Sequence, residues 1–117
     1  MTSYQQYFVS RETQEVNVDI NGKIIKFVIR KLPWSLRNKI ISNSVTYDTK
    51  GNINFDGDHY YRECLKYMIV EAPWGVTNDI VLQQIDDDLG AALEALVPKA
   101  FNAASINVQT VDSIKKG

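Results

Sequence analysis

The clearest pattern along the chain is an alternation of apolar and polar residues in "EVNVDINGKIIKFVIR", residues 15–30. Alternation with a period of two predicts strands that bury one face. Asn21-Gly22 in its middle predicts a type I′ turn, because both central residues of that turn need positive φ. Counting outward from the turn pairs Val18 with Ile25 and Val16 with Phe27, so we expect an antiparallel hairpin with its apolar side chains on one face.

Helical spacing dominates the chain after this hairpin. Pro33 is expected to open the first helix, because a proline in the first turn gives up no needed N–H group. Aspartate and asparagine are favoured N-caps of the later helices. The four expected helices span residues 33–44, from Asp56 or Asp58 to 71, from Thr77 or Asn78 to 84, and from Asp86 onward, with Pro98 either kinking or ending the last.

The connection over residues 45–60 is rich in turn residues, with Lys50-Gly51 at its expected tip. It predicts a short hairpin or an extended excursion, and a third short strand over 52–55 remains open. The predicted fold is therefore α+β, an N-terminal β-hairpin packed on about four α-helices in one small domain. We expect that domain to span 11–104, between a flexible arm (1–10) and a flexible tail (105–117). The expected core is Val18, Ile25, Phe27, Leu36, Ile40, Leu65, Met68, Leu93 and Leu96.

The pattern Pro-Trp-x-x-x-Asn occurs twice, at Pro33 and at Pro73, and contains both tryptophans of the chain. The match ends after about ten residues, whereas a solenoid needs several longer copies. We interpret the two segments as one local device, in which proline sets the entry of a helix and tryptophan is buried at its base. Trp34 directly follows a strand and is assigned to the core.

Trp74 lies in a predicted loop beside a glycine, where a side chain can face outward. It is therefore the expected anchor for a protein partner, with Val76, Tyr60 and Tyr67 extending the patch. A second expected contact surface consists of Ile24 and Val28, on the hairpin face opposite the core. Unless the chain covers it, such an apolar strip favours self-association, so a homo-oligomer is a possible assembly.

Composition and charge narrow the function further. The chain has 117 residues, 44% of them hydrophobic, and a net charge of −1. This balance does not favour a nucleic-acid partner, which usually meets a basic surface. The apolar runs are too short to span a bilayer, and the N-terminus has no secretory pattern, so no membrane partner is expected.

The residue types needed for catalysis are scarce. His59 is the only histidine and Cys64 the only cysteine, so one chain cannot form a Ser-His-Asp triad or a multi-histidine metal site. Cys64 lies on an apolar helix face and is expected in the core. Residues 46–57 lack the first and last carboxylates of a calcium loop, and Asp86-Asp87-Asp88 is explained by a helix N-terminus. We therefore expect no enzyme activity, no cofactor, no metal and no catalytic residue.

The order of these segments resembles a known family. "VNVDINGKIIKFVIRKLPWSLRNKII" resembles the opening of tail assembly chaperones of tailed bacteriophages, in which a β-hairpin leads into a helix with the pattern Trp-x-x-x-Asn. "SVTYDTKGNINFDGDHYYRECLKYMIVEAPWGVT" is similar to the variable excursion, helix and Pro-aromatic loop that follow. "LQQIDDDLGAALEALV" is similar to the closing helix. The resemblance covers about residues 14–100, and the departures are Pro33 before the tryptophan and a longer tail after Phe101.

This resemblance implies a non-enzymatic assembly factor in the cytoplasm of the host cell. Such chaperones bind the tape measure protein, keep it soluble and help to recruit the tail tube protein. The alternative is a structural tail or baseplate component that stays in the virion. Finding or not finding the protein in purified particles separates the two.

Overall fold

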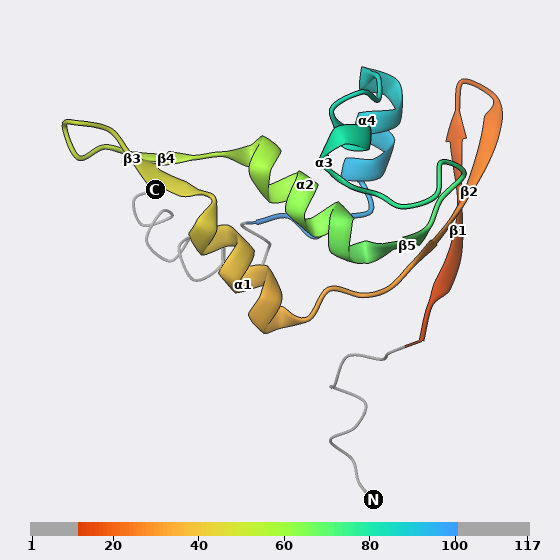
Figure 1. The fold of residues 1–117 in the computed structure, drawn as a ribbon, viewed down its shortest axis with the longest axis horizontal. Helices are drawn as coiled ribbons and strands as arrows, with labels where there is room; N and C mark the ends of the chain where they lie inside the picture. The colour runs from red at the N-terminus through yellow and green to blue at the C-terminus, as the bar shows by residue number, and fades with distance from the viewer. Residues whose placement is uncertain (1–11, 101–117) are drawn as a thin grey trace, which may run out of the picture.

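The computed structural model describes residues 12–100. The chain begins with β1 (Gln14–Ile20) and β2 (Lys23–Ile29), which form an antiparallel hairpin (Figure 1). The predicted register is confirmed, with Val16 opposite Phe27 and Val18 opposite Ile25. Asn21 and Gly22 adopt φ of 54° and 89°, as a type I′ turn requires.

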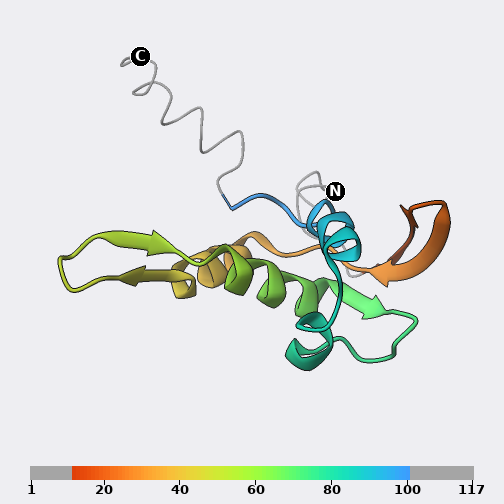
Figure 2. The ribbon, with the colours of Figure 1, turned by 90° about the horizontal axis from the view of Figure 1, so that it is seen from above.

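The next segment forms a helix and a projecting hairpin. α1 (Trp34–Asn43) begins directly after Pro33, which is its N-cap. β3 (Val45–Tyr47) and β4 (Ile53–Phe55) then pair with each other and project away from the rest of the protein (Figures 1 and 2). The strand expected over 52–55 therefore exists, but it belongs to a separate two-stranded sheet.

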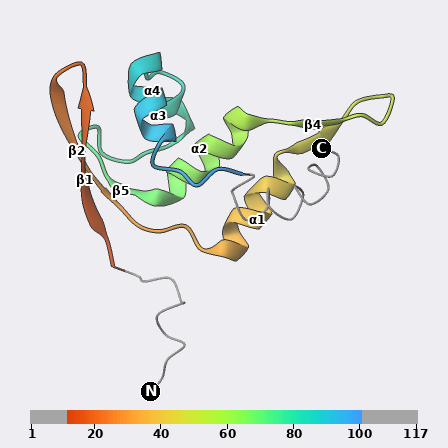
Figure 3. The same ribbon diagram turned by 180° about the vertical axis from the view of Figure 1, so that it is seen from behind.

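α2 (Gly57–Met68) lies at the centre of the fold, with α1 beside it (Figure 3). Asp56 caps it by accepting a hydrogen bond from the backbone N–H of His59 at 3.0 Å. The prediction that this helix continues to Glu71 is wrong, because β5 (Ile69–Glu71) pairs with β2. Two β-branched residues just before Ala72-Pro73 favour an extended backbone, and β2 offers them an unpaired edge. The main sheet thus has the order β1-β2-β5.

Two short helices complete the described fold. Asn78 caps α3 (Asp79–Leu82), and Asp86 caps α4 (Asp87–Glu94), each by accepting a backbone N–H bond. α4 ends before Pro98 rather than being kinked by it, and it packs against β1. These contacts hold α3 and α4 on the side of α2 that faces the main sheet (Figures 1 and 3).

The single core joins the inner face of the hairpin to α2 and α4. The predicted core residues Val18, Phe27, Ile40, Leu65, Met68 and Leu93 are buried, and Ile25, Leu36 and Leu96 are half-buried against them. The prediction missed some members of this core, namely Tyr60, Ile69, Leu82 and Val97. The expected arm (1–10) and tail (105–117) lie outside the described residues. Between residues 12 and 100, no helix is both long and apolar enough to cross a membrane.

Candidate partner-binding site

Trp74, the predicted anchor, faces the core. Its ring packs against Phe27 with centroids 5.4 Å apart, and its indole N–H donates to Thr77 Oγ1 at 2.8 Å. Gly75, with φ of 88°, makes the turn that folds the indole back, and its N–H bonds to the carbonyl of Ala72 at 3.0 Å. The expectation that Trp74 faces outward is wrong, because the ring contact and the indole hydrogen bond hold this half-buried side chain against the fold. Its role as a partner anchor stays a prediction.

Tyr60, expected to extend the same surface patch, is buried instead. It is 1% exposed, and its ring contacts Phe55 and Tyr61. Its hydroxyl donates to the carbonyl of Pro98 at 2.6 Å, which ties α2 to the segment after α4. Burial raises the pKa of Tyr60 to about 12, because the charged phenolate is disfavoured away from water.

The other two predicted patch residues lie in different surroundings. Tyr67 is half-buried beneath the guanidinium of Arg30, 3.9 Å from the ring centroid, and its carbonyl accepts a bond from Arg30 Nε at 2.7 Å. Val76 is 78% exposed. Of the four residues, Tyr60 is buried, Trp74 and Tyr67 are half-buried and Val76 is exposed, so they do not form the exposed patch that was expected.

Trp34 is 75% exposed, so its assignment to the core is wrong. It is the first residue of α1, and the buried residue of that helix is Ile40. Six residues at about 100° each place Trp34 about 120° around the helix from Ile40. The phase of the Leu36–Ile40 stripe, read together with the helix start at Pro33, was the signal that could have revealed this exposure.

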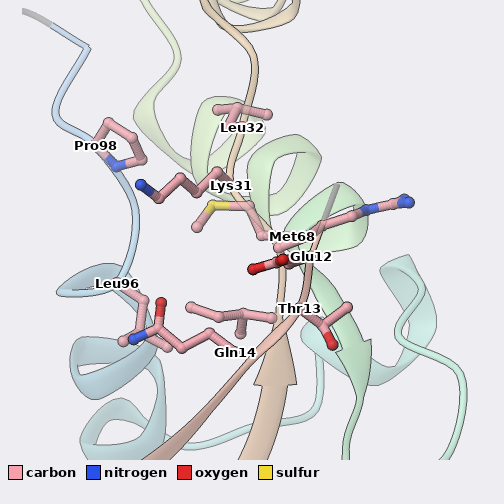
Figure 4. A pocket seen from close by; sticks show the side chains of 10 residues that line it. Glu12, Thr13, Gln14, Lys31, Leu32, Met68, Leu96 and Pro98 are labelled. Carbon is pink, nitrogen blue, oxygen red and sulfur yellow. The ribbon is translucent and has the colours of Figure 1, made fainter. Parts of the chain in front are cut away.

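The structure instead presents a pocket of about 420 Å³, here called the end pocket (Figure 4). Its apolar residues are Ile29, Leu32, Met68, Leu96 and Pro98, and its polar ones are Glu12, Thr13, Gln14, Arg30 and Lys31. In Figure 4 the Met68 thioether lies between Pro98 on one side and Glu12 on the other. Four separate segments of the chain therefore build one concave surface.

The wall of the end pocket is held in place by backbone and side-chain bonds. The N–H of Arg30 donates to the carbonyl of Met68 at 2.9 Å, and the Arg30 side chain is fixed on Tyr67. Lys31 is exposed at the rim. An apolar floor with a few polar groups around it suits an apolar side chain of a protein or peptide partner.

A second concavity of about 380 Å³, here called the α2–α4 groove, lies between those two helices. Its position depends on Asp79, which accepts bonds from Lys66 at 3.0 Å and from Arg62 at 2.8 Å and so holds α3 against α2. Lys66 and Arg62 together keep the pKa of Asp79 below its usual value. The groove is lined by Asp58, Tyr61, Arg62, Leu65, Leu82, Ile85, Asp86, Asp87, Gly90, Ala91 and Glu94.

The predicted self-association residues lie on the outer hairpin face. Ile24 is 60% exposed and Val28 is half-buried, and both line a shallow hollow that also includes Glu71 and Pro73. They are therefore brought together as expected, while self-association itself stays a prediction.

The candidate reactive residues lie within the fold. Cys64 is buried, as predicted, and burial raises the pKa of its thiol. His59 Nδ1 lies 2.9 Å from Ser44 Oγ, and that hydroxyl donates to the carbonyl of Ile40, so the ring N–H is the donor to Ser44. Over residues 12–100, no three His, Cys, Asp or Glu side chains are placed to hold a metal ion.

Comparison with known proteins adds no relative to this picture. No family model matches the chain, and neither a curated protein nor a solved structure matches it significantly.

Proposed function

We propose that this protein is a non-enzymatic tail assembly chaperone of a tailed phage, acting in the host cytoplasm. It binds the tape measure protein, keeps that protein soluble and helps to recruit the tail tube protein. The observation that carries the proposal is the end pocket, whose apolar floor lies open at the surface beside exposed Lys31. The order of hairpin, Pro-Trp helix, excursion and closing helices, which resembles that family, supplies the identity of the partner.

Exposed apolar side chains on projecting elements support a role in protein binding. Tyr47 and Ile53 are opposite each other on the β3–β4 hairpin and are 68% and 67% exposed. Trp34 is exposed at the start of α1. Large apolar side chains exposed in groups are typical of surfaces that contact other proteins.

Co-expression with the tape measure protein tests this proposal. We expect the wild-type chain to raise the soluble fraction of the tape measure protein and to co-purify with it. Thr13→Trp places a large side chain on the exposed wall of the end pocket and should weaken both effects. Asn17→Trp is the matched control, because Asn17 is exposed on β1 four residues further along the chain but does not line that pocket.

Two results would contradict the proposal. One is a tape measure protein that is equally insoluble with and without this chain. The other is a stoichiometric amount of the protein in purified phage particles, which would instead support a structural tail or baseplate component.

A further inference from the structure

The floor of the α2–α4 groove is made of apolar side chains, of which Tyr61 and Ile85 still reach its surface. Leu65 and Leu82 are buried beneath it, while Tyr61 and Ile85 are half-buried along it. Its volume of about 380 Å³ lies within the range of about 300–1,000 Å³ typical of ligand pockets. Two helices form its walls, which is the geometry that accepts a third helix along its apolar face.

A glycine lies in the α4 wall of this groove. Gly90 is in the middle of α4, where glycine costs about 1 kcal/mol relative to alanine. A Cβ at this position would meet Ile85 Cδ1 at 3.9 Å, an ordinary contact, so packing within the fold does not require glycine. Because glycine has no side chain, α4 presents bare backbone at this point of the groove, and another backbone can approach it closely.

The rim of the groove is acidic. It carries the carboxylates of Asp58, Asp86, Asp87 and Glu94 and the guanidinium of Arg62. Arg62 is already held by Asp58 and Asp79, each at 2.8 Å, so it does not neutralise the α4 side. Asp87 and Glu94 are exposed at opposite ends of α4, seven residues and about 10 Å apart.

We propose that the α2–α4 groove binds an amphipathic helix whose apolar stripe is flanked by lysine or arginine residues about two turns apart. The apolar stripe packs on Tyr61 and Ile85, above the buried Leu65 and Leu82, and the flanking cations lie near Asp87 and Glu94. The partner helix enters over Gly90. The proposal adds the chemistry of the bound segment to the proposed function, on which it rests for the source of that helix.

A synthetic helical peptide tests this site directly. The probe is a 14-residue peptide with leucine at i, i+3, i+4, i+7 and i+11, lysine beside the stripe and alanine elsewhere. Its twin carries glutamate in place of every lysine. We expect the lysine peptide to bind the full chain, more weakly at high salt, and the glutamate twin to bind at least tenfold more weakly.

Variants of the chain locate the binding. Gly90→Leu fills the groove and should weaken binding more than tenfold, whereas Gly90→Ala should bind nearly as the wild type does. The double variant Asp87→Asn, Glu94→Gln should weaken binding about fivefold, as expected for two exposed ion pairs. Asp88→Asn removes one carboxylate charge from the same helix, but Asp88 faces Asn21, 2.9 Å away, and does not line the groove. It should leave binding unchanged.

Three outcomes would overturn the proposal. They are equal binding of both peptides, no binding of the lysine peptide, and a dimer of the wild-type chain that Gly90→Leu dissociates, which would make a second copy the occupant. If Gly90→Leu fails to fold, the charge variants still show whether the lysine peptide binds at the acidic rim of the groove. A chain that solubilises the tape measure protein but ignores the lysine peptide would refute this inference alone, whereas the reverse result would refute the proposed function.

Discussion

The two Pro-Trp segments, residues 33–41 and 73–81, begin with the same residue pair. In one of them the isoleucine seven residues after the proline faces the core, and in the other the tryptophan does. In the first, Trp34 is exposed and Ile40 is buried. In the second, Trp74 packs on Phe27, and Ile80, at the position of Ile40, is 67% exposed. Two segments with similar residues in the same order therefore adopt different local structures.

The cause is the residue after each tryptophan. Ser35 continues a helix that begins at once after Pro33, so Asn38 lies within α1. Gly75 adopts φ of 88° and makes a turn, which delays the next helix until Asp79 and leaves Asn78 as its cap. A short motif specifies which residues are present, but the start of the helix decides which of them face the core.

The largest difference should appear when each tryptophan is removed. Trp74→Ala should lower the free energy of unfolding by about 3 kcal/mol, because it leaves a cavity beside Phe27 and frees Thr77. Trp34→Ala should change that free energy by less than about 0.5 kcal/mol, since this side chain is mostly in water. Urea denaturation of both variants checks the pair, and a larger loss for Trp34→Ala would reverse the comparison.

For the isoleucines, the first segment should lose more stability than the second, which is the reverse of the result expected for the tryptophans. Ile40→Ala should cost about 2–3 kcal/mol, because Ile40 is buried among the core residues. Ile80→Ala should cost less than about 0.5 kcal/mol. Thermal unfolding measured side by side gives the result, and equal losses would mean that α3 is more deeply packed than the structure shows.

The residue after each tryptophan, Ser35 in the first segment and Gly75 in the second, can be replaced to test its role. Gly75→Ala should destabilise the protein by about 1–2 kcal/mol through backbone strain alone, because the space around a new Cβ is open. Ser35→Ala should be neutral or slightly stabilising, since alanine is the better helix former. An unaffected Gly75→Ala would show that the turn can relax without strain.

The smallest effect concerns acid stability. The pKa of Asp79 is lowered by Lys66 and Arg62, so its contribution is present above the usual carboxyl pKa and is lost as pH falls through the lowered value. Asp79→Asn should therefore be less stable than wild type near pH 7, with the difference shrinking from about pH 4 downward. Lys39→Asn, at the matching exposed position of the first segment, should keep the wild-type pH dependence. Unfolding midpoints at several pH values provide the measurement.

Sequence alone determined the elements whose signals are local. The Asn21-Gly22 hairpin and its register and the Asp86 cap follow from turn chemistry, capping and periodicity, which act over a few residues. For the caps of α2 and α3 the sequence offered two candidates each, and the structure selects Asp56 and Asn78. The α+β class follows from the order of these elements. None of these features needs a contact between distant parts of the chain.

Tertiary structure decided the features that depend on distant partners. Ile69–Glu71 forms a strand because β2 offers an unpaired edge, and the Trp74 ring, turned back by Gly75, is held by its contact with Phe27. Tyr60 can be buried because its hydroxyl donates a hydrogen bond to the carbonyl of Pro98. The end pocket and the α2–α4 groove arise from segments far apart in sequence. No local sequence pattern encodes these two concavities. The free energy that fixes the side chains around them comes from packing and hydrogen bonds across the fold.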